Sequence, residues 1–113
     1  MKREEIFELS FQIIMNSGEA RSMAMEAISL AKNGEIEKAR NMITDARVEI
    51  NKAHRHQTSL IQSEANGETN EVTVLLIHSQ DHLMNGMTVL DMAEEFILSL
   101  IHISEPTRRV VIS

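Results

Sequence analysis

The sequence predicts an all-α fold, an up-down-up bundle of three helices, from three observations. Its 113 residues include eight Met but only three Phe and neither Trp nor Tyr, a composition that favours helix packing over a sheet. Four Gly and a single Pro are too few for a fold with many turns. Apolar residues also recur at intervals of three and four, which is the period of a helix.

The first helix is expected near residues 3 to 32. Its seam of regularly spaced residues, interrupted once by a polar side chain, is Ile6, Leu9, Ile13, Asn16, Ala20, Met23, Ala27 and Leu30. Gly18 costs about 1 kcal/mol in a helix interior, so we expect a kink there, with Ser17 or Asn16 capping a restarted helix. Gly34 then ends the helix, because glycine readily adopts the left-handed conformation of a helix stop.

The second helix is expected near residues 35 to 65. Its packing face is Ile36, Ala39, Ile43, Ala46, Ile50, Ala53, Gln57 and Leu60. The Ala residues permit close approach of a neighbouring helix, whereas Gln57 is an amide at a seam position and requires a specific hydrogen-bonding partner. Gly67 ends this helix, and Thr69 or Asn70 is expected to cap the next one.

The third helix, near residues 70 to 102, is apolar on two faces. One seam is Val72, Leu76, Ser79, Leu83, Leu90, Ala93 and Ile97; the other is Val74, Ile77, Asp81, Met84 and Thr88. Three helices of equal length cannot cover both seams, so the second seam requires another subunit, and a closed cyclic oligomer supplies it. Further side chains expected in an adaptable core are Met84, Met87 and Met92.

The net charge and the distribution of apolar residues argue against nucleic acid and a membrane as direct partners. A net charge of −6 with dispersed Lys and Arg offers no basic stripe for nucleic acid. No apolar run reaches the roughly 18 to 20 residues of a membrane span, and Met1 to Glu5 precede no signal-peptide core, so we expect a cytoplasmic protein without direct membrane insertion. The absence of Cys excludes disulfides and thiolate metal sites.

The segment from His78 to His82 places two His and an Asp in this otherwise apolar helix, and three interpretations remain open. The side chains are hydrogen-bonded core groups; or His78 and His82, four residues apart on one face, hold zinc with a carboxylate; or His78 is a nucleophilic imidazole that accepts a phosphoryl group. The zinc interpretation is weakened because the segment lacks the glutamate base of zinc proteases. Spacing alone ranks the nucleophile last.

Eight short segments, in order across all three helices, match one known family: Gly18–Ser22, Glu26-Ala27, Ala53-His54, Gln57-Thr58, Leu60-Ile61, Glu64-Ala65, Gly67-Glu68 and Leu75–Met84. With these segments the chain resembles the IIA component of the lactose/cellobiose (N,N′-diacetylchitobiose) family of the bacterial phosphoenolpyruvate-dependent sugar phosphotransferase system. The resemblance covers residues 4 to 98. It therefore favours the nucleophile over the other two interpretations.

The resemblance implies a trimer of three-helix subunits, that is, a nine-helix bundle. It implies a phosphotransferase component in which His78 accepts phosphate from the histidine-containing phosphocarrier protein and passes it to the IIB component, for uptake of a β-linked disaccharide. Asp81 would lie near the threefold axis and bind Mg²⁺, while His82 and Gln80 would support the His78 ring and the phosphate charge. A non-catalytic helical oligomerisation or metal-binding module is the alternative.

Residues 1–100 are expected to form the IIA domain and residues 101–113 a tail outside the family. The stretch Ser99–Arg109 is unlike the family's C-terminus and resembles translated sequencing-adaptor sequence, so it is given no functional role. Pro106 is expected to end the helical region. Gly86 stands where the family usually has Ala, and it is expected to loosen the third helix.

Overall fold

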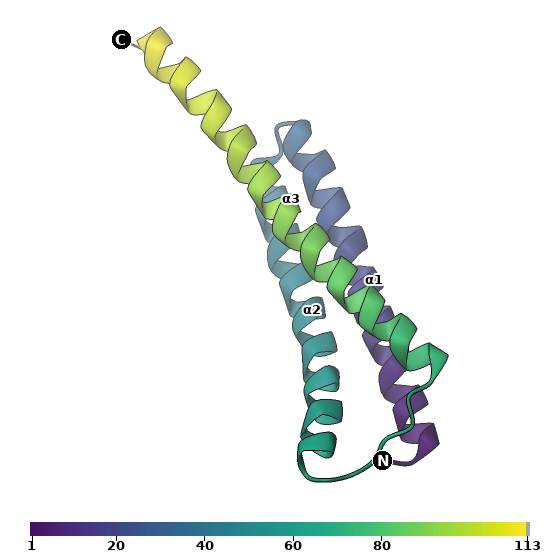
Figure 1. The fold of residues 1–113 in the computed structure, drawn as a ribbon. Helices are drawn as coiled ribbons and strands as arrows, with labels where there is room; N and C mark the ends of the chain where they lie inside the picture. Colours follow the sequence, from purple (N-terminus) through teal and green to yellow (C-terminus); the bar gives the residue numbers. More distant parts are fainter. Residues whose placement is uncertain (113) are drawn as a thin grey trace.

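The chain folds into three helices, described here by a computed structural model that covers the backbone of residues 1–112 and the side chains of residues 1–103. These helices are α1 (Arg3–Lys32), α2 (Ile36–Ala65) and α3 (Val74–Ile112), and no strand occurs in that part of the chain. Figure 1 shows α1 and α3 running in the same direction, with α2 antiparallel to both. The predicted up-down-up bundle is confirmed.

Glycine ends both α1 and α2 as the sequence predicts. Gly34 and Gly67 have φ angles of +83° and +88°, in the left-handed region that favours glycine. After each glycine the chain folds back onto the helix that it leaves. The amide of Glu35 donates to the Leu30 carbonyl, and the amide of Glu68 donates to the Ser63 carbonyl. These bonds satisfy carbonyls that the helix ends would otherwise leave open.

The core lies along the predicted seams of the three helices, except at Val72, which precedes α3 and is 68% exposed. Its fully or almost fully buried apolar side chains include Ile6, Ile13, Ala20, Ala27, Ala39, Ala46, Ile50, Ala53, Leu83, Leu90, Ala93 and Ile97. α1 packs along both other helices, whereas α2 and α3 meet over a shorter stretch. The many Ala residues let the helix axes approach closely, because a methyl group fills little of the space between them.

Two polar links join α2 to α3. The Gln57 Nε2 donates to the Gln80 Oε1 at 2.6 Å, which confirms that the Gln57 amide has a specific partner. Arg47 pairs with Asp91 and Glu94, each at 3.1 Å. Burial by itself lowers the pKa of Arg47, but the hydrogen bonds and charges of the two carboxylates outweigh burial and raise it. Arg47 therefore remains charged and bridges the two helices.

The helix α1 does not restart at Gly18, contrary to the expected kink. It continues unbroken from Arg3 to Lys32, and the buried Ser17 Oγ caps nothing and has no hydrogen-bond partner among the described residues. Ser17 instead packs against Gly86: a Cβ atom at Gly86 would lie 3.1 Å from the Ser17 carbonyl oxygen and 3.1 Å from the Ile50 Cδ1. Gly86 therefore permits close packing of α3 on α1 and α2, rather than loosening α3.

Replacing Gly86 with Leu is expected to lower the free energy of unfolding by about 1–3 kcal/mol, because the backbone of Ser17 cannot move aside easily. Gly18→Ala is the matched control. A Cβ atom at Gly18 meets nothing within 4 Å, so Ala is expected to add up to about 1 kcal/mol through helix propensity. Chemical denaturation measures both changes. A Gly86→Leu protein as stable as the parent would contradict the close packing.

The helix α3 begins later than predicted. It starts at Val74, and the Thr73 Oγ1 accepts a hydrogen bond from the Leu76 amide at 3.1 Å, so Thr73 is the cap rather than Thr69 or Asn70. Asn70 binds elsewhere, because its side-chain oxygen accepts from the Met1 amine at 2.8 Å. Residues 68–73 are thereby held as a non-helical link across the end of the bundle.

The helix α3 also ends later than predicted. It continues through Pro106 to Ile112 and projects beyond the turn between α1 and α2 (Figure 1). Proline lacks an amide hydrogen and removes one backbone hydrogen bond, and this local loss does not end the helix. The side chains of residues 104–113, including Arg108 and Arg109, lie outside the described residues.

Stability near the N-terminus is expected to depend on pH through Glu68. A hydrogen bond from Ser63, followed by the hydrogen bond and charge of the Met1 amine, lowers the pKa of Glu68 from its ordinary value of 4.5. A carboxylate with a lowered folded-state pKa stabilises the fold above the unfolded-state value and loses that effect as the pH falls.

We therefore expect Glu68→Gln to reduce the melting temperature at neutral pH, and the difference from the parent to vanish as the pH falls through and below about 4.5. Melting curves recorded across that range measure the difference. Glu64→Gln, a change at an exposed residue on the same end of α2, is the control. A Glu68→Gln difference that persists unchanged in acid would contradict the assignment.

Candidate active site

His78 and His82 form a side-chain pair near the start of α3. Their Nε2 atoms lie 3.1 Å apart, and the rings meet edge to face with centroids separated by 4.5 Å and planes at 87°. At this distance one Nε2 donates its hydrogen and the other accepts it with its lone pair. The predicted common face of the two residues, one helical turn apart, is therefore confirmed.

The two rings differ in exposure. His78 is exposed, whereas His82 is half-buried. In the single chain His78 is thus a surface group rather than a core group, which removes the first of the three interpretations for that residue. An exposed imidazole with one nitrogen lone pair is accessible to a second protein and able to act as a nucleophile near neutral pH.

Gln80 does not join the histidine pair. Two residues along a helix correspond to a rotation of about 200°, so Gln80 lies on the other side of α3 from His78. Its Oε1 accepts from Gln57 on α2, and its Nε2 donates to the Ser79 Oγ at 3.4 Å. Ser79 in turn donates to the Leu76 carbonyl at 2.6 Å. Gln80 therefore links α3 to α2 beside the pair.

Asp81 lies in a strip of exposed apolar side chains on α3. Val74, Ile77 and Met84 are 84%, 60% and 57% exposed, and Asp81 is exposed between them. Within the part of the chain that the structure describes, no three His, Cys, Asp or Glu side chains gather to hold a metal ion. A single chain thus brings one carboxylate to this strip. Its oxygen atoms suit Mg²⁺, which needs several oxygen ligands.

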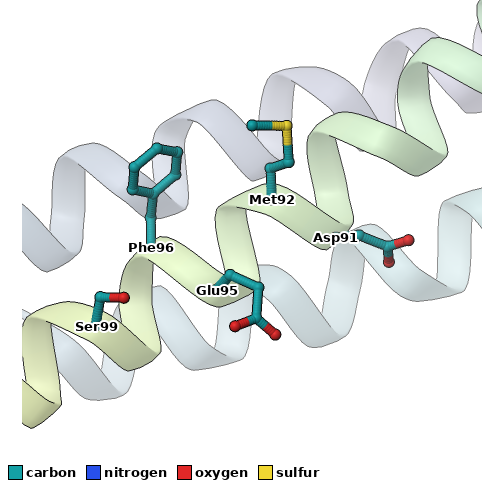
Figure 2. A pocket seen from close by; sticks show the side chains of 5 residues that line it. All are labelled: Asp91, Met92, Glu95, Phe96 and Ser99. Carbon is teal, nitrogen blue, oxygen red and sulfur yellow. The ribbon is translucent and has the colours of Figure 1, made fainter.

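Apolar exposure continues toward the C-terminal half of α3. A shallow hollow of about 290 Å³ is lined there by Asp91, Met92, Glu95, Phe96 and Ser99. Figure 2 shows Met92 and Phe96 side by side on one flank, with the Glu95 carboxylate directed to the other. Met84 and Met92 are both more than half exposed, so the expectation that they lie in the core is wrong for the single chain.

This longer apolar surface was missed from the sequence, although its signal is present. Met92 and Phe96 are four residues apart and therefore share a face of α3.

Of the other histidines, His54 lies on α2 and lines a separate hollow with Val48, Asn51 and Arg55. The contact between the His78 and His82 rings makes this pair the candidate site.

Comparison with known proteins identifies the family of this chain. A family model, the lactose/cellobiose-specific IIA subunit of the PTS system, matches residues 8–100. The lichenan-specific phosphotransferase enzyme IIA component of Bacillus subtilis is 56% identical over 94 residues, which are 83% of this chain and 86% of that protein.

Solved structures of the same family share the fold. The crystal structure of the PTS cellobiose-specific enzyme IIA from Bacillus anthracis has a TM-score of 0.85 and 49% identity, covering 92% of this chain and 94% of that one. The IIA(Chitobiose) chain, in solution structures of its HPr complex from Escherichia coli, has a TM-score of 0.76 and 34% identity, with coverage of 88% and 96%.

The fold and these matches define a component of a sugar phosphotransferase system. More narrowly, the chain belongs to the lactose/cellobiose-specific IIA family. None of the helices in the described region is long and apolar enough to cross a membrane.

Proposed function

We propose that the protein is a phosphoryl carrier that accepts phosphate on His78 from the histidine-containing phosphocarrier protein and passes it to the IIB component. The observation that carries this proposal is the exposed His78 imidazole, whose Nε2 is held 3.1 Å from the His82 Nε2. A relative with 34% identity has been solved in complex with HPr, the histidine-containing phosphocarrier protein, and this complex supports the choice of phosphoryl donor. The transported sugar is a β-linked disaccharide, and the carrier acts in the cytoplasm, reaching the membrane through its partners.

The transfer step needs one free nitrogen lone pair. The two Nε2 atoms share one hydrogen, and we assign it to His82, so neutral His78 carries its own ring hydrogen on Nδ1 and its Nε2 accepts from His82. Rotation of the His82 ring breaks this hydrogen bond and frees the His78 lone pair, which attacks the phosphorus atom of the donor phosphohistidine. The phosphorus–nitrogen bond of the donor breaks, and its electron pair returns to the donor ring.

His82 supports the product of that step. Once the His78 Nε2 carries the phosphoryl group, the His82 hydrogen turns to a phosphoryl oxygen, where a charge-assisted hydrogen bond stabilises the negative charge. Transfer to the IIB component reverses the bond changes on His78. Gln80 contributes by linking α3 to Gln57 of α2 next to the pair, rather than by contacting the phosphate.

The working assembly is a homotrimer built on the exposed strip of α3. Val74, Ile77 and Met84 expose apolar surface that a second and third copy would cover, and closed cyclic symmetry satisfies all copies equally. Asp81 lies in the same strip, so a threefold axis there would bring three carboxylates together. Their oxygen atoms would hold Mg²⁺, which offsets the mutual repulsion.

The proposal is tested by incubating the protein with phosphoenolpyruvate, the first enzyme of the phosphotransferase system and the phosphocarrier protein. Intact mass spectrometry at neutral pH is expected to show the gain of one phosphoryl group per chain, and its loss when purified IIB is added. A folded, assembled protein that gains no phosphoryl group would instead favour a non-catalytic oligomerisation or metal-binding module.

A further inference from the structure

We propose that the two Nε2 atoms of His78 and His82 together bind a divalent transition-metal ion such as zinc, and that this ion blocks the phosphoryl acceptor. The pair lies on one regular helix, one turn apart, so the backbone fixes the spacing of the two rings. His78 is exposed and His82 is half-buried, which leaves the pair open to ions from solvent.

The spacing of the two nitrogens fits one shared ion. Zinc binds imidazole nitrogen at about 2.05 Å, and tetrahedral geometry then separates two such nitrogens by about 3.3 Å. The observed separation of the two Nε2 atoms is 3.1 Å. Seating the ion needs an increase of about 0.2 Å in this separation and a turn of about 35° in the direction of each lone pair, because tetrahedral coordination places the ion beside the line that joins the two nitrogens.

Metal binding also requires two lone pairs directed at the same point. In the resting pair one Nε2 carries a hydrogen, and we assign that hydrogen to His82. A tautomer shift moves it to the His82 Nδ1 through solvent, which frees the second lone pair without changing the charge of either ring. Both lone pairs are then available to the ion, which lies beside the line that joins the two nitrogens.

The ligand set selects a class of ion. Imidazole nitrogens suit zinc, copper and nickel, whereas Mg²⁺ prefers oxygen ligands and retains its water. No third His, Cys, Asp or Glu completes a cluster in the described region, so water fills the other positions. A site with two protein ligands exchanges its ion readily, in contrast to a closed structural zinc site. It is distinct from the Mg²⁺ site proposed at Asp81.

Inhibition follows because the ion and the phosphoryl group use the same lone pair of His78. Zinc on the pair occupies the Nε2 that attacks phosphorus, and a phosphorylated His78 no longer has that lone pair to offer. This inhibitory half of the inference rests on the proposed function. The binding half does not, since it concerns the unphosphorylated protein alone.

Isothermal titration of ZnCl₂ into untagged, unphosphorylated protein tests the binding. We expect one zinc per chain, with an affinity at least about tenfold weaker in His78→Ala and, separately, in His82→Ala. His56→Ala, which removes a histidine from α2, is the matched control and should bind as the parent does. Asp81→Leu should also leave zinc binding unchanged, which separates the pair from an ion held by Asp81. Millimolar Mg²⁺ should not displace the zinc.

Zinc binding that survives either single substitution at the pair, or that depends on Asp81 or His56, would overturn the inference, as would the absence of binding at 100 µM zinc. The inhibitory half is read separately, by the rate of phosphoryl uptake with and without zinc and then with added chelator. Parent protein that binds zinc but is phosphorylated at the same rate overturns that half. If the protein is never phosphorylated, even with chelator, the proposed function fails while the zinc titration still stands.

Discussion

Replacing His78 with Ala is expected to abolish acid-labile phosphate uptake, because the substitution removes the only nitrogen that the proposed transfer uses. The side chain is exposed, so its loss leaves no cavity, and we expect helicity and assembly to remain nearly unchanged. Circular dichroism and sedimentation check the fold, and intact mass after incubation with the phosphocarrier checks the transfer.

The substitution His82→Ala distinguishes the residue that accepts the phosphoryl group from the residue that supports it. It removes the hydrogen-bond donor that supports the phosphoryl group but leaves the nucleophile, so the transfer rate is expected to fall by about 10²-fold without reaching zero. His54→Ala, on α2, is the control and should transfer at the parent rate. Phosphoryl uptake by the His78→Ala protein at the parent's rate would show that the acceptor lies elsewhere.

Replacing Ile77 with Asp is expected to dissociate the proposed trimer. Ile77 is 60% exposed in the single chain, and in the trimer it would be covered by other copies. Burying an unpaired carboxylate there costs several kcal/mol, so association should weaken by at least about 10²-fold. Sedimentation velocity across a micromolar concentration series, with physiological magnesium, measures the change.

Two further variants make the assembly prediction specific. Asp81→Leu should preserve or strengthen association, because it removes three converging charges from an apolar strip. Val48→Asp alters an exposed apolar residue on α2 and should leave the oligomer intact. A parent protein that sediments as a monomer, or an Ile77→Asp protein that assembles as the parent does, would contradict the proposed trimer.

The sequence predicted the helices and their stops well where the signal is local. Gly34 and Gly67 both take the positive φ that a helix stop requires, and α1 has the predicted bounds. The seams succeeded for most of their residues because regular spacing decides which side of a helix can be buried. Val72 was wrong, because it precedes α3 and is exposed, and the buried Ser10, Ala24 and Ala31 were missed. Gln57 found its expected partner because a half-buried amide needs one.

The failures at Asn70 and Gly86 have tertiary causes. Asn70 did not cap α3 because the Met1 amine, distant in sequence, binds its side chain. Gly18 was expected to break α1, and Gly86 to loosen α3, because glycine disfavours an isolated helix. Close packing at Gly86 outweighs that preference, and only the three-dimensional arrangement shows that Ser17 lies against it.

The candidate site was predicted in part. Spacing placed His78 and His82 on one face, but it could not give the distance between their nitrogens or the greater exposure of His78. Each residue turns a helix by about 100°, so the sequence alone could have placed Gln80 on the opposite side of α3 from His78. The resemblance to the IIA family led instead to the expectation that Gln80 supports the His78 ring.

The most direct test of the central claim is to locate the phosphoryl group on the parent protein. After incubation with phosphoenolpyruvate, the first enzyme and the phosphocarrier protein, fragmentation mass spectrometry at neutral to alkaline pH should place a single phosphoryl group on His78, with none on His54, His56 or His82. A phosphoryl group found on another residue, or none on a fully folded protein with active partners, would contradict the account.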